Sequence, residues 1–226
     1  MNDSFYIGAY WGGRAETLTE VVTKIVKTLE RLGRIDEQFS GWYELGMSRK
    51  KALENEVHID ADNIRRLCLQ KVKRKELDEV GYSKTGFLFS LWTGHKDEES
   101  SSISLNVGAT FKSDKLKNSC VIKIPYEGEA RERILKPDIA KKIITTLVEL
   151  WNPEYAVLTS HKLYDNLNVG NKVGWITYGK TIKNVPKIGG SFVYEKNEHG
   201  HLFCIKNDED YNLGLLSDLL AFAEVF

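Results

Sequence analysis

Three strand-like segments follow one another closely in the middle of the chain, at residues 86–95, 102–111 and 119–125. Each segment alternates apolar with polar side chains or is enriched in β-branched and aromatic residues, which is typical of sheets with one buried face. The connections between them are too short for a crossover helix, so neighbouring strands should run antiparallel. These segments therefore predict an antiparallel meander.

Helices are predicted before this meander. An aromatic strand at residues 5–11 ends at two glycines, and Thr17 and Glu20 then have the spacing of a capping box. Behind this cap, apolar side chains recur along one helix face at Leu18, Val21, Val22, Ile25, Leu29 and Leu32. Two further helices are expected, a short one after Ser48 and one capped by Asp60.

The second half of the chain mixes both element types. Amphipathic helices are predicted at residues 138–151, with Ile139, Ile143, Leu147 and Leu150 on one stripe, and at 212–226, with Leu216, Leu219, Leu220, Ala223 and Phe226 aligned. Short strands are predicted between them at residues 155–159, 173–178, 190–195 and 202–205. Because helices interrupt runs of strands without regular βαβ alternation, the pattern favours an α+β fold, a mostly antiparallel sheet with several packed helices. Without an internal repeat or linker, we expect a single domain over residues 1–226.

Composition narrows the function classes. Thirty-two basic and thirty-two acidic side chains cancel, so the net charge gives no general attraction to nucleic acid or an anionic membrane. The cysteines Cys68, Cys120 and Cys204 lie in apolar runs, as buried thiols of a reducing compartment do. The N-terminus lacks a signal-peptide pattern, and no segment approaches the roughly 18–20 apolar residues of a membrane span. We therefore expect a cytoplasmic protein.

Catalytic and cofactor motifs are sparse. The sequence contains no phosphate-binding glycine loop, no nucleophile elbow and no Asp/Glu-x-Lys nuclease signature. His199 and His201 could share a strand face near Cys204, but the acids nearest to them, at residues 208–210, lie in a polar turn, so a hydrophilic hairpin tip is favoured over a metal site. We expect no enzyme activity, no cofactor and no metal. A hydrolase that uses paired acids or a metal at His199 and His201 is the alternative.

A second alternative is a nucleic-acid-binding module. The helix after Asp60 has a basic outer side formed by Arg65, Arg66, Lys71, Lys73, Arg74 and Lys75. A charge run on a short helix is usually its solvated face, and the neutral net charge does not favour a nucleic-acid partner.

Short aromatic and glycine motifs occur in a fixed order along the chain. They comprise Tyr10, Trp11, Gly12, Arg14, Glu16, Trp42, Tyr43, Gly46, Ser48, Arg49, Ala52, Pro153, Tyr155, Gly174, Trp175, Thr177 and Tyr178. In order and spacing they resemble the immunity protein 52 family of bacterial polymorphic-toxin systems. The resemblance implies a single immunity-protein-like domain that acts as a cytoplasmic antitoxin. Its partner would be a cognate toxin domain bound one to one, a restriction-endonuclease-like DNase that is delivered by contact-dependent or type VI secretion.

An antitoxin of this kind needs aromatic and arginine anchors within a polar rim. The candidate anchors are Trp11, Arg14, Trp42, Tyr43, Trp92, Trp175 and Tyr178, although tryptophans are often core residues. The carboxylates of Asp97, Glu98 and Glu99 lie in a polar loop between two predicted strands, where they could imitate DNA phosphates. The antitoxin could instead cover a surface through which the toxin assembles or folds.

Overall fold

The structure is a computed structural model of the chain. It describes residues 3–72, 77–110, 118–167, 172–185, 189–207, 211 and 213–223. The chain forms two compact units, one of Tyr10–Ile122 and one that combines Met1–Ala9 with Lys123–Phe226. The expectation of one domain over residues 1–226 stays a prediction.

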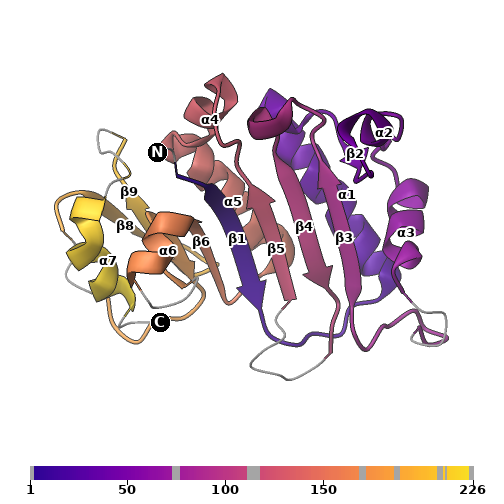
Figure 1. Cartoon of the computed structure of the whole chain (residues 1–226). Coiled ribbons are helices and arrows are strands. Elements are labelled where there is room, and N and C mark those ends of the chain that lie inside the picture. Colours follow the sequence, from indigo (N-terminus) through magenta and orange to yellow (C-terminus); the bar gives the residue numbers. More distant parts are fainter. Residues whose placement is uncertain are drawn as a thin grey trace. The chain divides into compact units, whose positions relative to one another are not determined.

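The meander predicted from the sequence lies in the unit Tyr10–Ile122. Its strands are β3 (Phe87–Trp92), β4 (Ser102–Val107) and β5 (Asn118–Lys123), and the unit's strand order is β2-β3-β4-β5, with β2 at Tyr43–Glu44. β3 and β4 pair antiparallel from Phe87 opposite Val107 to Trp92 opposite Ser102. β2 continues the sheet antiparallel, with Tyr43 opposite Trp92. In Figure 1, β2 and the short helix α2 (Arg49–Leu53) accordingly lie beside β3.

The first long helix, α1 (Leu18–Ile35), has the cap that its sequence predicts. The hydroxyl of Thr17 accepts a hydrogen bond from the backbone of Glu20, whose carboxylate accepts one from the Thr17 backbone. All six apolar residues predicted on its inner face are buried. α3 (Ala61–Gln70), capped by Asp60, packs beside α1 and β3. Both predicted caps are therefore confirmed.

The other unit contains both helices and strands. Its helices are α4 (Glu129–Ile134), α5 (Pro137–Trp151), α6 (His161–Leu167) and α7 (Leu216–Ala223). Its strands β6 (Tyr155–Ser160), β7 (Ile176–Gly179), β9 (His201–Ile205) and β8 (Phe192–Lys196) follow that order in space, and each pairs antiparallel with the next. β1 (Phe5–Trp11) has residues in both units. Antiparallel strands with packed helices confirm the predicted α+β class, and no described helix has the length and apolar character to cross a membrane.

Several local predictions need correction. The buried face of α5 is rotated from the predicted stripe, because Ala140, Ile144 and Val148 are buried while Ile139 and Leu150 are only partly so. Within the described residues the terminal helix α7 is preceded by a 3₁₀ turn at Leu213–Leu215, and it buries Leu219 and Phe222 but leaves Leu220 exposed. In both helices the apolar residues cover more than one face, so periodicity alone does not fix the buried side.

Candidate partner-binding surface

The connection between β3 and β4 forms an acidic turn, Lys96–Ser100. Asp97, Glu98 and Glu99 form a single 3₁₀ turn here, and all three side chains are exposed. Asp97 has a positive φ of 28°, a conformation that a short polar side chain tolerates better than most. The hydroxyl of Ser100 donates to the carbonyl of His95 at 2.5 Å and closes the turn. The turn therefore presents three neighbouring carboxylates to solvent, as the sequence suggested.

A buried glutamine holds this turn in place. Gln38 lies in the 3₁₀ turn η1 (Glu37–Phe39), and only 3% of its surface is exposed. Its amide nitrogen donates to the carbonyl of Glu99 at 2.8 Å, with the hydroxyls of Thr93 and Ser101 at 3.3 and 3.4 Å. Because the residues at both ends of the turn share one amide, the carboxylates are displayed on a fixed frame. Nothing in the local sequence around Gln38 signals this role.

An aromatic pair lies at the edge of the same turn. The rings of Tyr43 and Trp92 are 6.2 Å apart and tilted, and both side chains are partly exposed. The indole N–H of Trp92 donates to the carbonyl of Glu44 at 3.1 Å. Gly94 has a φ of +72°, and a Cβ added there would lie 2.5 Å from the Tyr43 ring. The aromatic pair and the acidic turn therefore form one continuous surface.

The predicted anchors Trp11 and Arg14 belong to a charge cluster around the buried carboxylate of Glu16, and Trp11 itself is buried. The guanidinium of Arg14 lies 5.3 Å from the centre of the Trp11 ring and 3.3 Å from the carboxylate of Glu16. Glu16 also pairs with Lys24 and is 4% exposed, whereas the side chains of both cations are about a third exposed. The backbone N–H of Arg14 donates to the carbonyl of Ala109 at 2.9 Å. Together these contacts fix the loop between β1 and α1.

Three other predicted anchors are buried. Trp42 is 1% exposed and stacks on Phe39 at 6.1 Å. Trp175 is 1% exposed, with the Phe5 ring 5.3 Å away. Tyr178 is 2% exposed, and its hydroxyl donates to a backbone carbonyl at 2.6 Å, while burial raises its pKa to about 12. In this conformation the three side chains pack the interior.

The Gly-Trp-x-Thr-Tyr motif has a clear structural basis. A Cβ at Gly174 would lie 2.0 Å from the carbonyl oxygen of Leu158, so only glycine fits against this backbone. The hydroxyl of Thr177 donates to the Gly174 carbonyl at 2.8 Å and accepts from its N–H at 2.9 Å. The motif therefore forms a tight turn that leads into β7.

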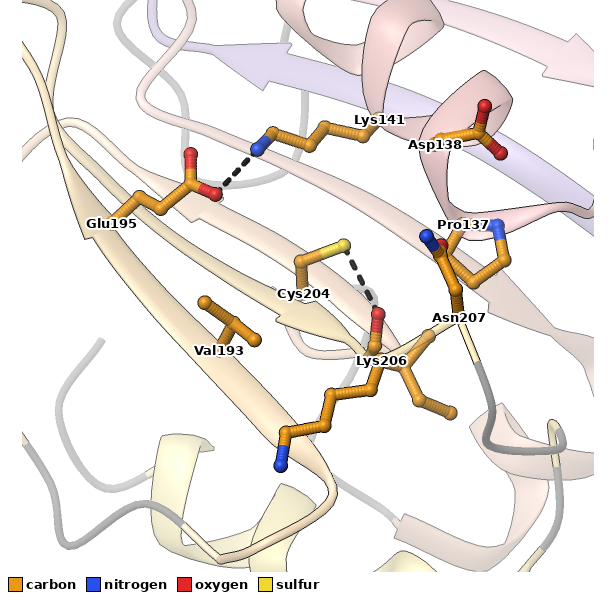
Figure 2. Close-up of a pocket in the computed structure, with 9 residues that line it drawn as sticks. Pro137, Asp138, Lys141, Val193, Glu195, Cys204, Lys206 and Asn207 are labelled. Carbon is orange, nitrogen blue, oxygen red and sulfur yellow. Dashed lines mark hydrogen bonds and ion pairs between the residues drawn. The ribbon is translucent and has the colours of Figure 1, made fainter.

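A hollow lies in the other unit, between the first turn of α5 and strands β8 and β9 (Figure 2). It has a volume of about 370 Å³, and the ion pair between Lys141 and Glu195, at 2.5 Å, lies on its rim. Cys204 lines the hollow, and burial raises the pKa of its thiol to about 11. The thiol is therefore protonated near neutral pH and a poor nucleophile.

The histidines of the alternative metal site lie at the tip of the β8–β9 hairpin. His199 is in the turn, 3.6 Å from the carboxylate of Glu198, and its carbonyl accepts the Tyr178 hydroxyl. His201 lies on β9, with its Nδ1 2.8 Å from the hydroxyl of Tyr194, and burial lowers its pKa. The described parts of the chain hold no group of three or more residues suited to a metal, and residues 208–210 lie outside them.

The basic helix of the other alternative is α3. Arg66 pairs with Glu44 at 2.6 Å, and Arg65 donates to the hydroxyl of Thr19 at 3.0 Å. These two arginines therefore tie α3 to neighbouring elements. Lys71 is the exposed C-cap residue of α3, and Lys73, Arg74 and Lys75 lie outside the described residues.

Comparison with known proteins assigns the family. The model of the family described as Immunity protein 52 matches residues 3–211. A solved structure titled "Pseudomonas aeruginosa T6SS protein PA0821" has a similar fold, with a TM-score of 0.52 and 10% sequence identity; the alignment covers 98% of this chain and 72% of that chain. The search among curated proteins found no match. Because the family match spans most of its length, the chain belongs to the immunity protein 52 family.

Proposed function

We propose that this protein is a cytoplasmic antitoxin that neutralises a cognate toxin domain by direct one-to-one binding. The observation that carries the proposal is the family match over residues 3–211. The rigid, exposed acidic turn provides a surface suited to such binding. Inhibition by binding needs no reaction by this chain, so we propose that it acts without enzymatic activity, cofactor or metal.

The partner that we propose is a restriction-endonuclease-like DNase. A nuclease of this kind attracts DNA with a basic cleft, and three carboxylates in a row can occupy that cleft as phosphates would. The side chains of Asp97, Glu98 and Glu99 are exposed, whereas the buried amide of Gln38 donates to the backbone carbonyl of Glu99. Such an arrangement raises the association rate by electrostatic attraction and loses little entropy on binding. The solved structure with a similar fold is titled as a T6SS protein, which supports type VI secretion as the delivery route of this toxin.

The predicted contact residues form two groups, one that is exposed or partly exposed and one that is buried. We propose that Asp97, Glu98, Glu99, Tyr43, Trp92 and Arg14 contact the toxin, because each is at least partly exposed. Trp11 and Trp42 would support this surface from the interior of the same unit, whereas Trp175 and Tyr178 pack the interior of the other unit. This division suits a family with varied partners, since a shared interior can carry contact residues that differ from pair to pair.

The proposal is tested by co-expression with the toxin domain encoded at the C-terminus of the adjacent large open reading frame. Rescue of growth, co-purification of a one-to-one complex and loss of DNase activity are the expected results. Killing in the presence of abundant soluble antitoxin, without a complex, would overturn the proposal. A complex that forms while the nuclease stays active on short DNA in vitro would instead indicate that the antitoxin covers an assembly surface.

A charge-neutral variant tests the role of the acidic turn. Replacing Asp97, Glu98 and Glu99 by Asn, Gln and Gln should slow association with the toxin about tenfold or more at low salt, with a smaller effect at high salt. The control is Glu127→Gln with Glu129→Gln, which removes two exposed carboxylates at the start of α4. Equal association rates for both variants in stopped-flow binding would exclude the acidic turn as the steering element.

A further inference from the structure

The turn between β2 and α2, residues 45–48, exposes two large apolar side chains. Leu45 is 63% exposed and Met47 is fully exposed. Single exposed apolar residues are common on protein surfaces and need no explanation. Here, however, two of them share one turn, and that turn is held rigid from both sides.

One set of contacts fixes the turn to its own helix. A Cβ at Gly46 would lie 2.7 Å from the backbone nitrogen of Ala52, so the turn packs directly on the backbone of α2. The hydroxyl of Ser48 caps α2 by accepting from its third backbone N–H. The N–H of Glu44 donates to the carbonyl of Asn55 at 3.0 Å. The path of the chain is therefore set before and after the exposed residues.

A second set of contacts joins this turn to the acidic turn. The guanidinium of Arg49 donates to the carbonyl of Gly94 at 3.3 Å, and the Tyr43 ring covers Gly94. Trp92 reaches in the opposite direction, to the carbonyl of Glu44. Two turns that lie about fifty residues apart in the sequence thus form one preorganised surface. Binding by such a surface loses less conformational entropy than binding by mobile loops.

The charges around Leu45 and Met47 favour a protein partner over nucleic acid or lipid. The acidic turn presents three exposed carboxylates, and α2 presents the exposed basic residues Arg49, Lys50 and Lys51, of which Arg49 reaches the carbonyl of Gly94 next to the acidic turn. Three adjacent carboxylates repel nucleic acid and anionic lipid. An apolar centre within a rim of both charge signs is instead the anatomy of a protein–protein interface.

We propose that Leu45 and Met47 are the hydrophobic anchor of the toxin interface. They insert into an apolar pocket of the toxin domain, while the acidic turn and α2 orient it. Methionine suits this task because its unbranched, polarisable side chain adapts to the shape of a pocket. The inference rests on the proposed antitoxin function and adds to it the residues that supply affinity, as distinct from the carboxylates that supply association rate.

The test compares purified wild-type protein and single variants by calorimetric titration with a catalytically inactive toxin domain. Met47→Asp and Leu45→Ala should each weaken the complex about thirtyfold or more, mainly through faster dissociation. Met47→Leu should bind within about threefold of wild type, because it keeps an apolar group of similar size. The matched control is Val80→Asp, at a residue that is 69% exposed in another turn of the same unit.

The outcomes separate this inference from the antitoxin proposal. If the wild type binds the toxin and Met47→Asp binds equally well, the anchor is overturned and the antitoxin function stands. If the wild type does not bind the toxin at all, both the anchor and the antitoxin function are overturned. If Met47→Asp changes only a self-association seen by light scattering, the surface joins two copies of this chain and the anchor is overturned. Because both side chains are largely exposed, thermal unfolding should be unchanged in every variant.

Discussion

Removing the amide of Gln38 should loosen the acidic turn without changing its carboxylates. In Gln38→Met the volume is nearly kept, but the carbonyl of Glu99, now 2.8 Å from the amide nitrogen, loses its donor. The hydroxyl of Thr93 loses less, because it also accepts the backbone N–H of Ser101 at 3.0 Å. The dominant cost is therefore the part-buried hydrogen bond to Glu99, and with the smaller losses at the buried hydroxyls of Thr93 and Ser101 the total is about 2–3 kcal/mol in the free energy of unfolding. For a chain of this size that corresponds to a fall in Tm of about 4–12 °C.

A glutamate at the same position makes the contact with the Glu99 carbonyl dependent on pH. In Gln38→Glu, a buried carboxylate would face the Glu99 carbonyl, so burial and repulsion should raise its pKa above that of the unfolded chain. Below the unfolded pKa the protonated group can donate as the amide does, and the variant should approach wild-type stability. As the pH rises through the raised folded pKa, the stability contributed by this proton is lost. The variant should thus be more destabilised at pH 7 than at pH 4.

The assay is urea unfolding followed by tryptophan fluorescence at both pH values, together with the rate of association with the toxin domain. Gln38→Met should slow association because the turn is less ordered, although all three carboxylates remain. Unfolding free energies within about 0.5 kcal/mol of wild type for Gln38→Met, or a pH-independent effect of Gln38→Glu, would refute the role of this amide.

Two further predictions concern the scaffold. Gly174→Ala should lower the free energy of unfolding by about 3 kcal/mol or more, because its methyl group would collide with the carbonyl of Leu158, whereas Gly190→Ala, at a position with open space around it, should have little effect in the same urea titration. Hydrogen bonds from Thr17 lower the pKa of Glu20, so the stability that this carboxylate contributes is present at neutral pH and is lost as the pH falls through the lowered value. Glu20→Gln should accordingly flatten the acid limb of the stability profile; an unchanged acid limb would mean that the capping box does not titrate with folding.

Local signals explain which parts of the fold are predictable from the sequence. The capping box at Thr17 and the helix behind it depend on residues within two turns, so they are correctly predicted. Helix α6 is missed because its start depends on distant contacts, since the N–H of Lys162 donates to the carboxylate of Asp3. Helix α4 is missed because its sequence, EARERI, has no apolar stripe.

The candidate surface is only partly predictable for a similar reason. Charge and loop composition identify Asp97, Glu98 and Glu99 as an exposed turn. Residue type does not distinguish buried Trp175 from the partly exposed Trp92, because both are large aromatics within strand-like runs. The partner of Gln38 lies 61 residues away in sequence, and no local pattern encodes such a contact.

The way in which Gln38 holds the acidic turn has a consequence for redesign. The amide binds a main-chain carbonyl and two flanking hydroxyls, not the carboxylates themselves. Side chains at positions 97–99 are therefore free to vary while the frame persists, with position 97 limited to residues that tolerate a positive φ. A randomised library at these three codons, selected against a different toxin, would sample new specificities on an unchanged scaffold. Natural divergence between toxin–antitoxin pairs can follow the same route.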